Sequence, residues 1–81
     1  MFTIYRKNVD GRILDRYFQK WENGKTLLIE EKDGMLANGW IEENHKDYFY
    51  SEKGFYVFYY ELRSPEGEKA ILSLIDGEFA D

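Results

Sequence analysis

The sequence contains no cysteine and only one histidine among its 81 residues. Without cysteine there can be no disulfide framework and no thiolate metal site, and nothing indicates an oxidising compartment. The longest apolar runs are far too short to span a bilayer, and the first residues lack the apolar segment of a signal peptide. The sequence therefore predicts a cytoplasmic protein with no membrane partner.

Groups that could carry out catalysis are also scarce. His45 is the single imidazole, and the neighbouring carboxylates of Glu42 and Glu43 could join it around a metal ion only in principle. One histidine among flexible carboxylates is usually part of a solvated loop. Adjacent carboxylates such as these two point to opposite faces of a strand, so they cannot share a proton. We therefore expect neither an enzyme nor a bound cofactor.

The net charge of −5 is unevenly distributed along the chain. Residues 1–32 carry seven basic and five acidic side chains, whereas residues 33–81 carry four basic and eleven acidic ones. An acidic half argues against a phosphate-binding surface and favours a partner protein with a basic surface. The alternative is that the charge serves only solubility.

Aromatic residues are abundant, and more than half of them lie between Tyr48 and Tyr60. In an extended strand, Phe55, Val57 and Tyr59 point to one side and the residues between them to the other. Both faces of such a strand are apolar. The strand is therefore either covered on both sides, or it leaves one aromatic face bare for a partner.

The spacing of the glycines repeats. The intervals of 13 and then 10 residues from Gly11 through Gly24 to Gly34 recur 43 residues later in the chain. This repetition predicts an internal duplication. The expected repeat halves are residues 1–38 and 44–81.

Turn signals at these glycines divide the chain into strands. Asp10-Gly11 and Asn23-Gly24 are typical of two-residue hairpin turns, because both residue types accept positive φ. The expected strands are Phe2–Asn8, Arg12–Trp21, Thr26–Lys32, Lys46–Ser51, Phe55–Arg63 and Lys69–Ile75.

These strands predict a single all-β domain, residues 1–81, of two three-stranded antiparallel meanders packed as a small sandwich or partly open barrel. One segment leaves an alternative open. Leu14, Tyr17, Phe18 and Trp21 also have helical spacing. An α+β fold with a helix near residues 12–22 is the alternative.

Short strand pairs joined by DG, NG and EG turns, with DGMLANGW after a strand, resemble the MORN-like β-meander repeats found in antitoxin-type immunity proteins. The resemblance covers residues 10–40 and 53–81, although the Tyr-x-Gly start of a typical MORN unit is missing. It implies hairpins stacked in tandem.

The duplication also selects candidate binding residues. Phe55 and Tyr59 align with Arg12 and Arg16, and two arginines on one strand face almost always point into solvent. If the halves fold alike, the two aromatics are exposed interface anchors; if they pack asymmetrically, both belong to the core. Trp40 has the same two interpretations. The predicted partner-binding residues are Phe55, Tyr59, Tyr50, Trp40, Glu42, Glu43 and Glu61.

Together these features predict a small acidic module that binds and inhibits a basic, nucleic-acid-acting protein stoichiometrically. Small acidic immunity, antitoxin and phage anti-defence proteins act in this manner, and a homodimer is compatible with the same surface. The alternative is a β-module that holds a sugar, a peptide or single-stranded nucleic acid on its aromatic face. For nucleic acid, the phosphate contacts would be Arg6, Lys7, Arg12 and Arg16.

Overall fold

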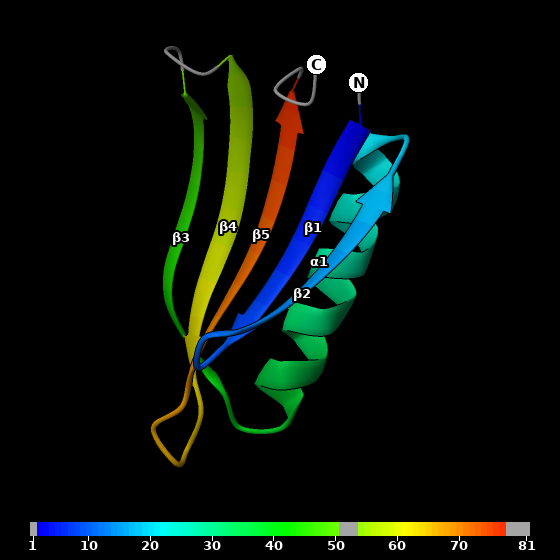
Figure 1. Ribbon diagram of the computed structural model, residues 1–81. Helices are drawn as coiled ribbons and strands as arrows, with labels where there is room; N and C mark the ends of the chain where they lie inside the picture. The colour runs from blue at the N-terminus through cyan, green and yellow to red at the C-terminus, as the bar shows by residue number, and fades with distance from the viewer. Residues whose placement is uncertain (1, 51–53, 78–81) are drawn as a thin grey trace.

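The protein is a two-layer structure of one β-sheet and one α-helix (Figure 1). The computed structural model describes residues 2–50 and 54–77, apart from the side chain of Tyr50. The elements in chain order are β1 (Phe2–Val9), β2 (Arg12–Phe18), α1 (Trp21–Ala37), β3 (Ile41–Tyr50), β4 (Phe55–Arg63) and β5 (Lys69–Gly77). Of the residues described, none forms a helix that is both long and apolar enough to cross a membrane.

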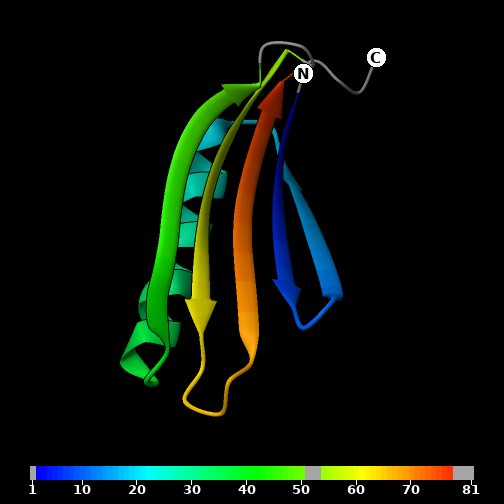
Figure 2. The same ribbon diagram turned by 90° about the vertical axis from the view of Figure 1, so that its left-hand side faces the viewer.

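The five strands form one sheet in the order β2-β1-β5-β4-β3, and every neighbouring pair is antiparallel. The first and last strands of the chain therefore lie side by side near the middle of the sheet, and β2 and β3 form its edges. In Figure 2 the sheet stands in front of α1, and no described helix or strand lies on the near side of the sheet. We call this uncovered surface the open face.

The core lies between α1 and the sheet. Successive strand residues point to opposite faces, and every second residue of β5, namely Ala70, Leu72 and Leu74, is fully buried. Leu28 of α1 is fully buried against them. Each buried leucine contributes about 1.5 to 3 kcal/mol through burial, so this layer supplies most of the stability.

A partly buried hydrogen bond also joins the two layers. The Tyr5 hydroxyl donates to Glu31 Oε1 of α1 over 2.6 Å, and Lys7 Nζ lies 3.5 Å from the same oxygen. Burial, and after it the neighbouring Glu31 carboxylate, raise the pKa of Tyr5 well above its ordinary value. The phenol therefore stays protonated and keeps donating to Glu31 in the folded protein.

The sequence-based expectation of a mainly antiparallel β-structure is confirmed, whereas the two-meander arrangement is wrong. Residues 26–32 were expected to form a strand, but they lie inside α1. The alternative helix near residues 12–22 is also wrong, because residues 12–18 form β2. A single sheet with one helix replaces the sandwich or barrel.

The turn predictions have mixed outcomes. Asp10 and Gly11 have φ values of 52° and 86°, as a two-residue hairpin turn requires, so that turn is confirmed. Asn23-Gly24 does not form a turn, because both residues lie in the first turns of α1. A Cβ atom on Gly24 would lie 2.7 Å from Leu74 Cδ1, so this glycine permits close approach of helix and sheet.

The proposed duplication is not confirmed by the fold. The hairpins β1–β2 and β3–β4 occupy corresponding parts of the two halves, but the element that follows is α1 in one half and β5 in the other. The first hairpin presents its first strand to β5, whereas the second hairpin presents its second strand. The two halves therefore do not share one three-stranded unit.

Candidate protein-binding surface

The strand registers assign each side chain of the sheet to one of its two faces. Residues directly opposite each other on antiparallel strands point to the same side. Tyr5 and Phe58 are both opposite the buried Leu74, so all three lie under α1. Their sequence neighbours Val57 and Tyr59 therefore belong to the open face. The aromatic strand β4 thus has one covered face and one face without a covering element among the described residues.

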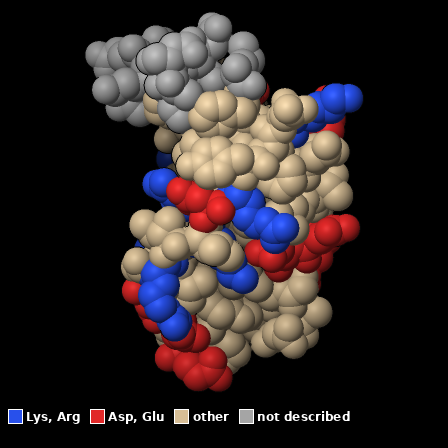
Figure 3. Space-filling view, turned by 45° about the vertical axis from the view of Figure 1, so that its right-hand side comes forward, with Lys and Arg blue, Asp and Glu red and all other residues tan. Residues whose placement is uncertain are grey.

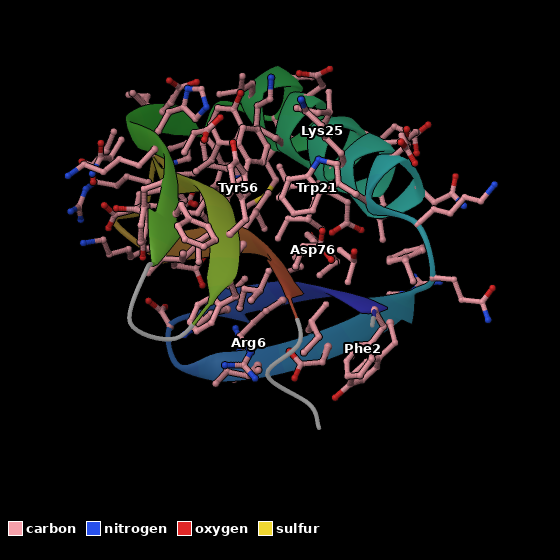
Figure 4. All side chains as sticks on the ribbon, turned by 90° about the horizontal axis from the view of Figure 1, so that it is seen from above. Phe2, Arg6, Trp21, Lys25, Tyr56 and Asp76 are labelled. Carbon is pink, nitrogen blue, oxygen red and sulfur yellow. The ribbon has the colours of Figure 1, made fainter. Side chains whose placement is uncertain are left out.

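Figure 4 shows the two sides of the sheet from above. Trp21, Tyr56 and Asp76 lie between the sheet and α1, whereas Phe2 and Arg6 project from the opposite side. On the helix side, Trp21 packs edge-on against Tyr56 with ring centroids 5.1 Å apart. The two surfaces of the sheet therefore have different neighbours.

One row of apolar side chains crosses the open face from edge to edge. From β2 to β3 this cross-sheet row consists of Tyr17, Ile4, Ile75, Val57 and Tyr48, each opposite the next. Ile4 and Val57 are only 8% and 7% exposed, whereas Tyr17 and Tyr48 are 64% and 40% exposed. The row therefore has a buried centre and an accessible tyrosine at each end.

Two aromatic pairs extend this row. Phe2 packs on Tyr17 with ring centroids 5.5 Å apart, and Tyr48 meets Tyr59 edge-on at 6.4 Å. Such tilted and edge-on arrangements are favourable for aromatic rings at these distances. The pairs fix the orientation of the exposed tyrosines, so less conformational freedom remains to be lost when a partner binds.

The charged groups of the open face are mostly paired with one another. The ion pairs are Arg6 with Asp15 at 2.8 Å, Arg63 with Glu43 at 2.7 Å and Lys69 with Glu61 at 3.3 Å. The basic partners lower the pKa of Asp15 and of Glu43. The pKa of Glu61 is lowered by hydrogen bonds, first from Asn44 and to a smaller extent from Lys69. Among the described residues of this face, Lys46 is the cation without such a carboxylate.

The side of the molecule drawn in Figure 3, where α1 and β2 lie, also carries a mixture of charges. Its Lys and Arg side chains lie among Asp and Glu side chains rather than in a patch of one sign. A surface that binds a phosphate backbone needs several cations that are free to contact phosphate oxygens. The described part of the open face does not provide them.

The structure brings together four of the seven predicted binding residues. Phe55, Tyr59 and Glu61 alternate along β4 on the open face, and Glu43 reaches Arg63 of the same face. Tyr50 is opposite Phe55 in the sheet register, but its side chain lies outside the described residues.

Two predicted residues lie elsewhere. Trp40, in the link between α1 and β3, is half-buried and packs against the core cluster, so the core interpretation describes it. Glu42 is opposite the buried Leu62 and therefore belongs to the helix side of the sheet, where it is exposed at the edge. Neither residue contributes to the open face.

The alignment that singled out Phe55 and Tyr59 does not hold. Arg16 is opposite Tyr5 and therefore faces the helix side, as does Arg12, whereas both aromatics face the open side. The sequence reasoning also missed Tyr17 and the rest of the cross-sheet row. The Asp10-Gly11 turn was the available signal, because a two-residue hairpin fixes Ile4 opposite Tyr17.

His45 has a structural environment on the helix side. Its ring stacks on the Tyr60 ring with centroids 4.3 Å apart and an interplanar angle of 7°. Lys32 Nζ lies 5.1 Å from the centre of the Tyr60 ring. Within the described ranges there is no group of three or more His, Cys, Asp or Glu side chains positioned to hold a metal ion.

Comparison with known proteins does not place the chain in a family. It matches no family model, no curated protein and no solved structure. The functional argument therefore rests on the surface geometry.

Proposed function

We propose that the protein is a small acidic module that binds a basic protein on its open face and inhibits it stoichiometrically. Immunity, antitoxin and anti-defence proteins are the functional classes that fit this role. The observation that carries the proposal is the cross-sheet row, an apolar strip across all five strands that no described element covers. Its accessible part is the tyrosine at each end, Tyr17 and Tyr48, and exposed aromatic side chains beside an apolar strip are typical of interaction sites.

The exposed tyrosines favour a protein as the partner. Tyrosine is enriched at protein interfaces because its ring buries a large apolar area while its hydroxyl can still form a hydrogen bond. Tyr17, Tyr48 and Tyr59 surround the buried centre formed by Ile4 and Val57. Ile4 and Val57 are already buried in the free chain, so the tyrosines supply the area that a partner can contact.

Charge narrows the choice of partner. The net charge of −5 repels nucleic acid and also a second copy of the chain, and it attracts a basic protein. The paired charges on the open face leave little for phosphate to bind. A basic protein with an apolar contact patch therefore fits this surface better than nucleic acid or a second copy does.

The proposal is tested by affinity capture with the tagged protein, followed by titration of the purified partner in a calorimeter. The double variant Tyr17→Ser with Tyr48→Ser should weaken binding by about 100-fold or more, because such anchors carry most interface energy. The matched control is Leu14→Ser with Leu36→Ser, which changes exposed residues outside the open face. Its affinity should equal that of the wild type.

Rising salt should also slow association, because opposite net charges steer the encounter. The proposal is wrong if the control variant loses as much affinity as the tyrosine variant. It is also wrong if the captured partner is acidic or is a nucleic acid.

A further inference from the structure

β3 is the longer of the two sheet edges. It runs for ten residues, and in the described part of the chain it pairs only with β4. A register irregularity lies between Glu42 and Asn44, and the pairing is regular from Asn44 onwards. Along this regular part, no strand of the described residues lies beside the outward-facing N–H and C=O groups. An edge of this kind is a template for pairing with another chain.

The opposite edge differs in its surroundings. β2 is seven residues long, and α1 packs against β2 as well as against β1 and β5. β3 is three residues longer and lies farther from the helix, although exposed side chains occur on the helix side of both edges, with Phe49 at 62% and Leu14 at 60%. The two edges are therefore not equivalent as docking places.

One backbone group of this stretch is occupied by a side chain, because the His45 N–H donates to Asn44 Oδ1 over 2.9 Å, and the other polar side chains of β3 mostly turn inwards. Natural edge strands commonly project charged groups that discourage pairing. Here the side chains from Asn44 to Tyr48, apart from Lys46, are engaged by the inner neighbour β4. The contacts are Asn44 with Glu61, His45 with Tyr60, Asp47 with Tyr56, and Tyr48 with Tyr59.

A hollow lies along the same segment. Its volume is about 580 Å³, and it is lined by His45, Lys46, Asp47, Tyr48 and Tyr59. These residues are successive positions of β3 together with the open-face tyrosine of β4. The hollow therefore gives a neighbouring chain room beside the backbone of β3 and continues onto the open face.

We propose that an extended, Lys- or Arg-rich segment of the partner pairs with Asn44–Phe49 of β3 as a sixth strand. This inference rests on the proposed function and specifies how the partner docks. Asn44–Phe49 itself carries one carboxylate, Asp47, and one lysine, Lys46, so the preference for a basic segment comes from Glu42 and Glu43 at the start of β3 and from the net charge of −5 of the chain, which a second copy would repeat. Backbone hydrogen bonds supply the pairing, and alternate side chains contact the two faces of the sheet.

The test uses a defined probe, a nine-residue peptide of alternating lysine and valine with blocked ends. Amide hydrogen exchange of the isotope-labelled protein is measured by NMR with and without this peptide. The amides of Asn44–Phe49 that do not bond to β4 should exchange rapidly in the free protein, apart from that of His45, which donates to Asn44 Oδ1. With the peptide in excess they should slow by about tenfold or more, since pairing protects them from solvent.

A control peptide separates strand pairing from simple charge attraction. In this peptide proline replaces valine, so the charge is kept but the N–H groups that a β-ladder needs are removed. It should give no protection. Equal protection by both peptides, or protection along β2 instead of β3, would overturn the proposal.

A pair of variants locates the site. Phe49→Lys puts a positive charge on the edge of β3, and Leu14→Lys does the same on the edge of β2, where Leu14 is 60% exposed on the same side of the sheet. The first change should weaken peptide binding about fivefold or more, and the second should leave it unchanged. Equal effects would again overturn the proposal.

The edge proposal and the proposed function can fail separately. If the captured partner depends on Tyr17 and Tyr48 but is unaffected by Phe49→Lys, the open-face function stands and the edge proposal is overturned. If the free protein sediments as a dimer and its β3 amides are already protected, the strand beside β3 belongs to a second copy. That outcome overturns the proposal of a basic segment. Loss of partner binding with Phe49→Lys, together with peptide protection confined to β3, supports the proposal.

Discussion

Gly24 lies where α1 comes closest to the sheet. A methyl group at this position would meet Leu74 Cδ1 at 2.7 Å, and both Phe18 Cδ2 and Thr3 Cγ2 at 3.3 Å. Gly34 lies in the same helix but has open space around it. The two glycines therefore differ in packing although both are helical.

We predict opposite effects for the same substitution at these two glycines. Gly24→Ala should lower the free energy of unfolding by about 0.5 to 2 kcal/mol, because the overpacking cost exceeds the gain in helix propensity. Gly34→Ala should raise it by about 0.5 to 1 kcal/mol. Urea unfolding curves of the two variants measure both values. Equal stabilisation in both would show that the helix can move away from Leu74 at no cost.

Gly24 also explains why the sequence predicted a hairpin turn where the structure has a helix. Asn23-Gly24 between apolar segments is a hairpin signal, and nothing local contradicts it. The requirement that fixes Gly24 is contact with Leu74 and Thr3, which are distant in sequence. By contrast, the Asp10-Gly11 turn is decided by local φ values, and the sequence predicted it correctly.

At the scale of elements, β4 has two faces with different surroundings. Tyr60 is 8% exposed and lies between the His45 ring and the Lys32 ammonium group. Its neighbour Tyr59 is on the open face, half-buried and edge-on to Tyr48. Alternation along an aromatic strand predicted this separation, because it depends only on the period of two.

The neighbouring tyrosines of β4 give a matched test of the two faces. Tyr60→Ser should cost about 3 to 5 kcal/mol, as removal of a large buried ring does. Tyr59→Ser should cost about 1 kcal/mol, because less surface and fewer contacts are lost. Thermal or urea unfolding of both variants measures the difference. Similar losses would mean that the open face is as fully packed as the face under α1.

The helix could not be predicted in the same way. Lys20 precedes α1 without a side-chain capping bond, no basic residue lies in its last turn, and its sequence contains two glycines. The usual local signs of a helix are therefore weak. The helix is stabilised by tertiary contacts instead, above all by burial of Leu28 against β5. These contacts can be recognised only once the strand order is known.

At the scale of the whole molecule, the hydrogen bond from Tyr5 to Glu31 joins the two layers. The pKa of Tyr5 is raised in the folded state, so its contribution to stability is complete below the unfolded pKa near 10. As the pH rises above that value, the unfolded chain releases the proton first and stability is lost. The maximum slope for one proton is about 1.4 kcal/mol per pH unit.

We predict that Tyr5→Phe is less stable than the wild type at neutral pH by about 1 to 2 kcal/mol. This difference should shrink between about pH 10 and 11.5, because only the wild type loses the tyrosine contribution there. Urea midpoints of both proteins across this range measure the effect. A difference that stays constant with pH would mean that the Tyr5 phenol is not protected by folding.

The order of the strands also determines when the chain can fold. The hairpins β1–β2 and β3–β4 are local, but β5 pairs with β1 over almost the whole described length, from Phe2 with Gly77 to Val9 with Ala70. α1 packs against β5 as well as against β1. The core between α1 and the sheet therefore cannot form from the first hairpin and the helix alone. During synthesis, the apolar surfaces of β1 and α1 remain unprotected until β5 has left the ribosome. In the nascent chain, chaperones and proteases can therefore bind these apolar surfaces of β1 and α1 until β5 is available to cover them.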